Sequence, residues 1–282
     1  MGSEMCIRDS YNTKKPNESK TAWRDEQGNY VYKYPHPALT ADAVVFGFDG
    51  SQLNVLLIMR KYEPFEGYWA LPGGFVRNDE TVEEAVKREL REETNLQLSY
   101  MEQFHIYSSP DRDPRERVVT VAFCALVRSD QCRVQGGDDA AVARWFRARQ
   151  LPVLAFDHLQ IITDALNFLY VKLENEPLAF DLLDKKFTLP QLQTLYEEVT
   201  GRKYDRRNFS RKMLQSGFLN RETEDDPFVM PAPNSAECEA EEYCVQKTRR
   251  SAHRPAAWFS FAKDNYEKVK KSTKRQRSPF DL

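Results

Sequence analysis

The sequence predicts an α+β fold in two domains. Between residues 35 and 175, long apolar runs alternate with polar turns, which indicates β-strands. Between residues 176 and 222, two short segments carry apolar residues at helical spacing. The length agrees, because 282 residues are many for one compact domain and enough for two, and 41% apolar residues can build real cores.

Composition excludes several classes of protein. The net charge is only −2, so any electrostatic preference for a partner must be local. No run of eighteen apolar residues is present, which excludes a membrane-spanning helix, and the N-terminal residues lack the apolar region of a secretory signal. The cysteines show no Cys-x-x-Cys pair and no histidine at zinc-ligand spacing, so we expect reduced thiols in a cytoplasmic protein: Cys6, Cys124, Cys132, Cys238 and Cys244.

Three apolar runs predict the strands of the first domain. "ADAVVFGFDG" ends in the turn Asp49-Gly50, and "LNVLLIMRK" follows it, so the two runs are expected to form a hairpin. "RVVTVAFCALV" (Arg117–Val127) lacks clean alternation, which indicates burial on both faces. Asp157 is expected to cap a helix over residues 158–175, whose apolar residues fall at helical spacing.

The stretch "RELREETNL" concentrates three glutamates on one helix. Thr81 and Glu84 form a T-x-x-E capping box, so a helix is predicted to begin at Thr81. Glu89, Glu92 and Glu93 then stand at i, i+3 and i+4 and project from one patch. Three carboxylates with no histidine or cysteine nearby suit Mg²⁺ or Mn²⁺, which could bridge substrate phosphates and activate a water. The alternative for such a cluster is a solvated acidic helix face.

The residues around this helix resemble the Nudix box. "LPGGF" places two glycines just before it, and the string from Gly74 to Leu96 matches the spacing G, five residues, E, seven residues, R-E-U-x-E-E. The one departure is Asn95, where the family has glycine; asparagine also tolerates a left-handed helix end. The resemblance implies that residues 35–175 form a Nudix α/β/α sandwich with a mixed sheet, and that the domain hydrolyses nucleoside diphosphate derivatives with Mg²⁺ or Mn²⁺.

The same resemblance implies a role for each matching residue. Glu89, Glu92 and Glu93 resemble the metal ligands and water-activating carboxylates, and Gly74 the glycine whose carbonyl helps to bind the metal. Arg88 and Glu80 resemble the ion pair that braces the loop to the helix, and they complete the predicted catalytic set.

Substrate binding is predicted from a loop rich in arginine. "SSPDRDPRERVV" offers Arg112, Arg115 and Arg117, and arginine forks suit phosphate groups. The stretch is similar to one in Nudix proteins related to ADP-ribose pyrophosphatase; the alternative is three solvated loop arginines. The histidines show no partner pattern and are expected to be ordinary surface or half-buried residues: His36, His105 and His158.

The second domain carries the pattern of a DNA-recognition helix. Thr188 and Gln191 make another capping box, and Asp205 is expected to cap the helix "RRNFSRKMLQSG" after a turn at Gly201. Phe209 and Met213 share one face of that helix. The candidate DNA-binding residues lie opposite or flank it: Arg206, Arg207, Asn208, Arg211 and Lys212. "GFLNRE" and "RPAAWFSF" are expected to pair as the strands of a wing, and the alternative is a solvated basic helix.

The order of these domains resembles the Nudix-related transcriptional regulators of NAD metabolism. In that family a Nudix domain senses ADP-ribose and a winged helix-turn-helix binds double-stranded operator DNA, which implies a homodimer here. Two alternatives stay open: a plain Nudix hydrolase without DNA binding, and a catalytically silent regulator that responds to a sugar. The expected segments are a disordered polar tail (1–34), the Nudix domain (35–175), the winged-helix core (176–222), an acidic and polar insert (223–253), a second wing strand with a C-terminal helix (254–271) and a basic tail (272–282).

Overall fold

The structure is a computed structural model that describes residue 27 and residues 34–94, 96, 98–128, 142–222 and 257–272. Asn95, most of the polar tail, the acidic insert and the basic tail from residue 273 onward lie outside the described residues. Cys124 is a buried free thiol, and the other four cysteines also lie outside the described residues. The described residues from Ala38 onward belong to one compact unit.

The larger sheet has seven strands and mixes parallel and antiparallel pairs. Its main path runs β3-β2-β1-β6-β5, with β4 added to β1 and β7 added to β2. β1 and β6 are parallel, and the other pairs are antiparallel. The strands are β1 (Ala38–Phe48), β2 (Leu53–Met59), β3 (Trp69–Ala70), β4 (Gly73–Phe75), β5 (Tyr100–Tyr107), β6 (Val118–Val127) and β7 (Ala143–Arg147).

The hairpin and the buried strand predicted from sequence are both confirmed. β1 pairs with β2 up to Phe48 and Leu53, and the Asp49 carboxylate accepts the backbone N–H groups of Ser51 and Gln52 at 2.9 Å each. β6 is buried along almost its whole length because β1 and β5 flank it in the sheet and helices pack over it.

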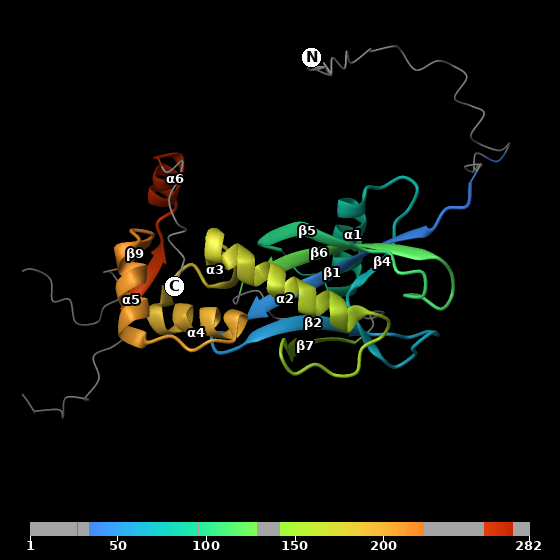
Figure 1. Cartoon of the computed structure of the whole chain (residues 1–282), viewed down its shortest axis with the longest axis horizontal. Coiled ribbons are helices and arrows are strands. Elements are labelled where there is room, and N and C mark those ends of the chain that lie inside the picture. Colours follow the sequence, from blue (N-terminus) through green and yellow to red (C-terminus); the bar gives the residue numbers. More distant parts are fainter. Residues whose placement is uncertain are drawn as a thin grey trace, which may run out of the picture. The chain divides into compact units, whose positions relative to one another are not determined.

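Helices cover both faces of this sheet, as the resemblance implied. Alternate residues of β1 point to opposite faces, so Ala41, Ala43 and Val45 pack against α1 (Val82–Thr94), whereas Val44 and Phe46 pack with α2 (His158–Asn175). Figure 1 shows α2 lying across the sheet. Among the described helices, none is long and apolar enough to cross a membrane.

The predicted cap of α2 is wrong in its chemistry. Asp157 stands at the N-cap position, but its side chain makes no capping hydrogen bond. Its carboxylate instead accepts two hydrogen bonds from Arg112, because a buried guanidinium needs a counter-charge more than the helix end needs a cap.

The second sheet has three strands in the order β8-β10-β9 and carries the winged helix. The predicted wing pair is confirmed, since β9 and β10 are antiparallel, but the short α3 and β8 were not predicted because four and two residues are too few for a periodic pattern. The elements are α3 (Ala179–Leu182), β8 (Phe187–Thr188), α4 (Leu189–Thr200), α5 (Arg206–Gln215), β9 (Leu219–Glu222), β10 (Trp258–Phe261) and α6 (Lys263–Ser272).

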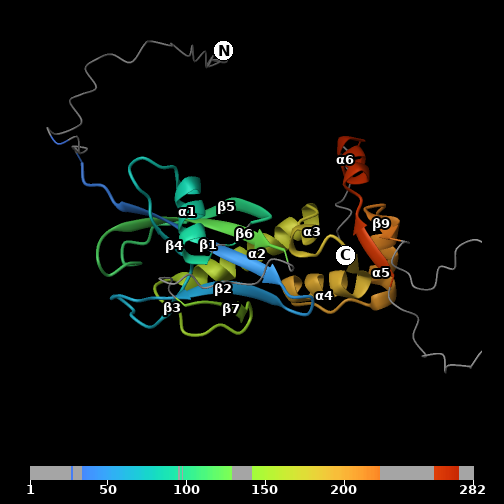
Figure 2. The same cartoon turned by 180° about the vertical axis from the view of Figure 1, so that it is seen from behind.

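Local signals place the helices of this domain. Thr188 and Gln191 form the predicted capping box, Gly201 ends α4 in the left-handed conformation, and the Asp205 carboxylate accepts the Asn208 backbone N–H at 2.9 Å. α4 then packs against α2 within one continuous apolar core, and the Tyr196 ring meets the Phe209 ring edge-to-face at 5.6 Å. Figure 2 shows α4 between the larger sheet and α5. The core therefore joins α5 to the larger sheet.

Candidate active site and nucleic-acid interface

Two glycines allow the loop before α1 to fit between β1 and the acidic patch. β4 pairs with β1 so that Gly73 faces Asp42 and Gly74 faces Ala41. A Cβ at Gly73, whose φ is +151°, would lie 2.4 Å from the Ala41 carbonyl oxygen. A Cβ at Gly74 would lie 2.4 Å from Glu89 Oε1. The close approach brings the Gly74 backbone against the Glu89 carboxylate.

Arg88 braces this loop to α1. Its Nε and Nη2 donate to both oxygens of Glu80, at 3.0 Å and 2.7 Å, and Nη2 also donates to the Phe75 carbonyl oxygen at 3.3 Å. The Arg88 hydrogen bonds lower the pKa of Glu80 to about 2, so this carboxylate stays ionised in the folded protein. Glu80 and Arg88 thus form a two-pronged ion pair whose role is positional.

The three glutamates share one patch of α1 but are held differently. Glu89 Oε1 lies 2.6 Å from Arg88 Nη1, whereas Glu92 is 54% exposed and lies 3.5 Å from the same nitrogen. Glu93 is largely buried, and its carboxylate accepts the Gly73 backbone N–H. Among the described residues, no group of three Asp, Glu, His or Cys side chains is close enough together to hold a metal ion without rearrangement. Arg88 is the counter-charge for two of the three carboxylates.

Glu93 nevertheless fits a cation. Its Oε2 is buried and has no hydrogen-bond partner among the described residues. Burial first, and then the negative charge of Glu89, raise the pKa of Glu93 to about 8. A buried, unpaired carboxylate oxygen beside other oxygen donors is the environment that a hard divalent cation stabilises.

A pocket of about 190 Å³ adjoins the Gly73–Gly74 loop. It brings together Gly74 and two of the three predicted substrate arginines, Arg112 and Arg115, but Arg117 does not line it. Arg117 instead donates to the Ser109 carbonyl oxygen at 3.2 Å. The other lining residues that matter below are Thr40, Asp42, Arg60, Phe156 and His158.

Each of the two pocket arginines from the predicted loop has an aspartate partner. Arg112 is only 4% exposed, and it donates to Asp157 at 2.8 Å and 3.0 Å. Arg115 donates to Asp113 at 2.8 Å and 3.1 Å. These salt bridges fix the direction of both guanidiniums beside the pocket.

Sequence reasoning missed several residues of this pocket. The expectation for His158 is wrong, because the ring is buried and its Nδ1 accepts the Leu71 backbone N–H at 2.9 Å; burial lowers its pKa, so it is neutral. Asp42 is buried in β1 and accepts the Thr120 hydroxyl at 2.6 Å. An acidic residue inside the apolar run "ADAVVFGF" was a signal that could have identified Asp42.

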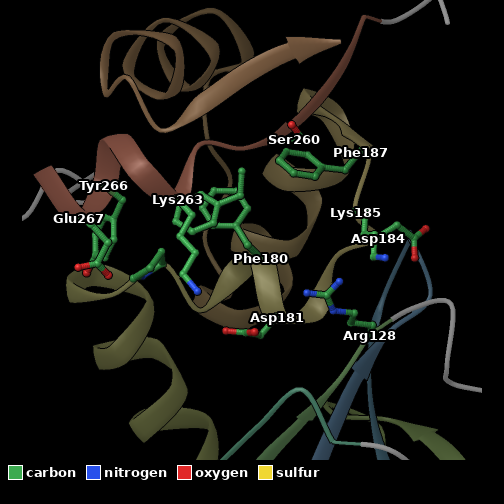
Figure 3. Close-up of a pocket in the computed structure, with 12 residues that line it drawn as sticks. Arg128, Phe180, Asp181, Asp184, Lys185, Phe187, Ser260, Lys263, Tyr266 and Glu267 are labelled. Carbon is green, nitrogen blue, oxygen red and sulfur yellow. The ribbon is translucent and has the colours of Figure 1, made fainter. Parts of the chain in front are cut away.

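A larger pocket of about 420 Å³ lies beside α3, β10 and α6 and includes none of the three glutamates of α1. Figure 3 shows Phe180 and Phe187 beside charged side chains of both signs. Its charged lining residues are three cations and three anions, so their formal charges cancel: Arg128, Lys185 and Lys263 against Asp181, Asp184 and Glu267.

α5 presents the candidate nucleic-acid interface. Phe209 and Met213 are buried against α4, as predicted. All five candidate DNA-binding residues are exposed, and Arg211 Nη2 donates to Asn208 Oδ1 at 3.1 Å. The helix therefore turns a basic, polar face outward: Arg206, Arg207, Asn208, Arg211 and Lys212.

The helix before α5 is fastened to the larger sheet at its C-terminal end. Arg149 donates to the carbonyl oxygens of Glu198 and Val199, at 3.1 Å and 2.9 Å. Arg147 pairs with the Glu198 carboxylate at 3.2 Å, and the Leu53 backbone N–H donates to it at 3.4 Å. The arginines satisfy the last carbonyls of α4 and complement its dipole.

Comparison with known proteins gives two family matches. Residues 36–165 match the NUDIX domain, and residues 179–227 match the NrtR DNA-binding winged helix domain. Both matches confirm the predicted fold class, a Nudix fold followed by a winged helix.

Relatives extend this likeness over both domains. The chain is 35% identical over 190 residues to the ADPR responsive transcriptional repressor NtrR of Acinetobacter baylyi, which is 66% of this chain and 76% of the relative. It is 45% identical over 135 residues to the ADP-ribose pyrophosphatase of Methanocaldococcus jannaschii, which is 48% of this chain and 76% of that protein. The crystal structure of Shewanella oneidensis NrtR complexed with a 27mer DNA aligns with a TM-score of 0.61 at 32% identity, covering 81% of this chain and 95% of that chain.

We expect Glu93→Gln to raise the melting temperature in chelator-containing buffer at pH 9 but not at pH 5. Between the ordinary value of 4.5 and the folded value of about 8, the folded protein retains a proton that the unfolded chain has lost. Stability therefore falls as pH rises through this window, and glutamine removes the loss, which is at most about 1.4 kcal/mol per unit of pKa difference. Melting curves from pH 5 to 9 measure it. The control is Glu83→Gln on the exposed face of α1, and parallel curves for Glu93→Gln and the wild type would contradict the prediction.

Proposed function

Since the chain belongs to the NrtR family of Nudix-domain regulators, we propose that it is a DNA-binding transcriptional repressor that responds to ADP-ribose and also hydrolyses it. The observation that carries the proposal is the joining of two intact parts in one chain. The Nudix domain keeps all three carboxylates on α1, and the winged helix exposes a basic α5. The proposal places the protein in the cytoplasm, where operator DNA is accessible.

The DNA-binding proposal rests on the outward face of α5. Arg207 and Arg211 can contact guanine edges, Asn208 can contact adenine, and Arg206 and Lys212 can hold phosphates. A homodimer would present two such helices to the half-sites of a two-fold operator, about 34 Å apart. The exposed side chains and the buried Phe209 support this orientation.

The hydrolytic proposal rests on the acidic patch. Glu89, Glu92, Glu93 and the Gly74 carbonyl would hold Mg²⁺ or Mn²⁺. A cation bound there would neutralise the diphosphate charge and lower the pKa of a water. Arg112 and Arg115 would orient the diphosphate, and Glu93 would accept the proton of the water that attacks phosphorus. Breaking the phosphoanhydride bond of ADP-ribose then gives AMP and ribose 5-phosphate.

A second candidate function is a sensor without turnover. The observation that favours it is the pairing of Arg88 with both Glu89 and Glu92, so that a cation would have to compete with a guanidinium for two of the three carboxylates. Such a protein would bind its effector, ADP-ribose or a sugar, and release it unchanged. A plain hydrolase is less well supported, because it would not require the exposed basic face of α5.

We expect Glu92→Gln and Glu93→Gln each to abolish Mg²⁺-dependent cleavage of ADP-ribose while the fold stays intact. Loss of a ligand or a proton acceptor should lower kcat by about 10²-fold or more. Release of AMP measures turnover, and circular dichroism checks the fold. Glu83→Gln should retain activity. Unchanged turnover in both variants would show that these glutamates do not form the catalytic site, and an inactive wild type would favour the sensor without turnover.

We expect Arg207→Ala and Arg211→Ala to weaken operator binding without affecting hydrolysis. A lost base contact should cost about 1–3 kcal/mol of binding free energy. A lost phosphate contact should instead reduce the slope of log binding constant against log salt concentration by about one. Stability should hardly change, because both side chains are exposed. Fluorescence anisotropy with labelled DNA from the region upstream of the protein's own gene measures both effects at several salt concentrations. Arg91→Ala on α1 is the control. Wild-type binding by both variants would show that α5 is not the recognition helix.

We expect ADP-ribose to loosen operator binding, and operator DNA to loosen ADP-ribose binding by the same factor. Asp157, the residue before α2, holds the pocket residue Arg112, and Leu169 and Leu173 of α2 pack in the core shared with α4. A coupling of about 1–3 kcal/mol corresponds to a fivefold to hundredfold change, and linkage makes it reciprocal. Titrations of both ligands in Glu92→Gln, which should not consume the effector, test this. A flat operator affinity at saturating ADP-ribose would mean that the repressor senses another ligand, such as a sugar.

A further inference from the structure

Arg60 is a pocket residue that the proposed chemistry has not used. It directly follows β2, and its Nε and Nη2 donate to the carbonyl oxygens of Pro64 and Tyr62, at 2.8 Å and 3.4 Å. Its guanidinium carbon lies 4.7 Å from the centre of the Phe156 ring. These contacts hold the side chain in place, and among the described residues Nη1 makes no hydrogen bond.

The ring beneath Arg60 is held by unusual backbone. Phe156 has a φ of +51° and Phe65 a φ of +66°, a left-handed conformation that residues other than glycine rarely adopt. The two rings meet edge-to-face at 4.9 Å, and the Phe156 ring also lies 5.4 Å from the His158 ring. Backbone strain of this kind gathers at binding sites. Here it places an aromatic face under a guanidinium that lines the pocket.

Arg60 differs from the other two pocket arginines in its charge balance. Arg112 and Arg115 each have an aspartate partner, whereas among the described residues Arg60 makes no salt bridge with a carboxylate. Arg115 lies 5.8 Å from the same Phe156 ring, so two cations share one aromatic residue. Burial first, and then the positive charge of Arg115, lower the pKa of Arg60, and the negative charges of Asp113 and Glu63 offset this only in part. An anion placed in the pocket would relieve this repulsion.

A second unsatisfied group lines the same pocket. Thr40 Oγ1 is buried and has no hydrogen-bond partner within the part of the chain that the structure describes. Buried hydroxyls normally have a partner, so this one indicates a missing acceptor or donor. The pocket volume of about 190 Å³ is below the range of roughly 300–1,000 Å³ for whole drug-sized ligands. It therefore suits part of a nucleotide, such as its phosphates.

We propose that Arg60, positioned by Phe156, selects a nucleoside diphosphate over a monophosphate. Its Nη1 donates to the phosphate that lies farther from the Gly74 loop, and the Thr40 hydroxyl donates to a phosphate oxygen in the same pocket. One pocket is lined both by Gly74, beside Glu89, and by Arg60, so a ligand with two phosphates can place one beside each. The inference rests on the proposed function, because it concerns recognition of ADP-ribose in that pocket.

The test is a comparison of ligands that differ by one phosphate. ADP-ribose, ADP and AMP are titrated calorimetrically into the full chain in chelator-containing buffer, with the wild type, Arg60→Gln and Arg60→Lys. Loss of a charged hydrogen bond should weaken ADP-ribose and ADP by about tenfold to a hundredfold in Arg60→Gln, and AMP by less than about threefold. Arg60→Lys should lie between, because lysine keeps the charge but not the planar fork that stacks on a ring.

The matched control is Arg144→Gln. It removes another arginine that lies over an aromatic ring, Trp69 at 5.8 Å, but Arg144 does not line the pocket. Its affinities for all three ligands should equal those of the wild type.

Three results would overturn the proposal. Equal losses for ADP and AMP in Arg60→Gln would show a merely structural role, and unchanged affinity for ADP would exclude contact with the phosphate. If Arg60→Gln does not fold, the same ratio in Arg60→Lys decides. A wild type that binds ADP-ribose neither in chelator nor with Mg²⁺ overturns the proposed function as well, whereas wild-type binding that Arg60→Gln and Arg60→Lys both retain overturns this inference alone.

Discussion

The parallel pairing of β1 with β6 is the constraint on which the rest of the structure depends. β1 also pairs with β2 and β4, so one strand is flanked by its hairpin partner, by the glycine loop and by the buried strand β6. Its two faces lie beneath α1 and α2, which requires small or apolar side chains on both. The polar exceptions, Thr40 and Asp42, stand where β4 joins the sheet. Polar chemistry is therefore confined to one end of a strand that is otherwise core.

Unbalanced charge of both signs gathers around that end. On one side, Glu93 is buried beside Glu89, and its raised pKa reflects the cost of ionising it there. On the other side, Arg60 shares the Phe156 ring with Arg115. Arg88 pairs with two glutamates and Asp113 pairs with Arg115, whereas among the described residues Glu93 and Arg60 form no salt bridge. A cation beside the glutamates and a diphosphate beside the arginines would remove both penalties, which gives the proposed ligand a physical reason to bind between them.

The two domains are joined by packing and by a small number of polar contacts. α2 starts at the Arg112–Asp157 salt bridge beside the pocket and ends in the core shared with α4. Arg149 and Arg147 then hold the C-terminal end of α4, and the Tyr196–Phe209 contact connects α4 to α5. A change at the pocket that moves α2 would therefore act on the elements that support α5, the proposed recognition helix. Close packing transmits such shifts because the core has little space to absorb them.

Short-range signals were enough for much of this protein. The sequence by itself determined the glutamate patch on α1, the caps at Thr81, Thr188 and Asp205, and the hairpin at Asp49, because each depends on residues within a few positions of one another. Only the tertiary structure decided the partners that lie far apart in the chain. His158 meets the Leu71 backbone 87 residues away, and Asp157 meets Arg112 across 45 residues, so a predicted cap became a counter-ion. In the sequence Arg60 is only the residue after a strand, and its contact with Phe156 exists only in the folded chain. Burial and charge balance depend on such distant neighbours, which no local pattern can specify.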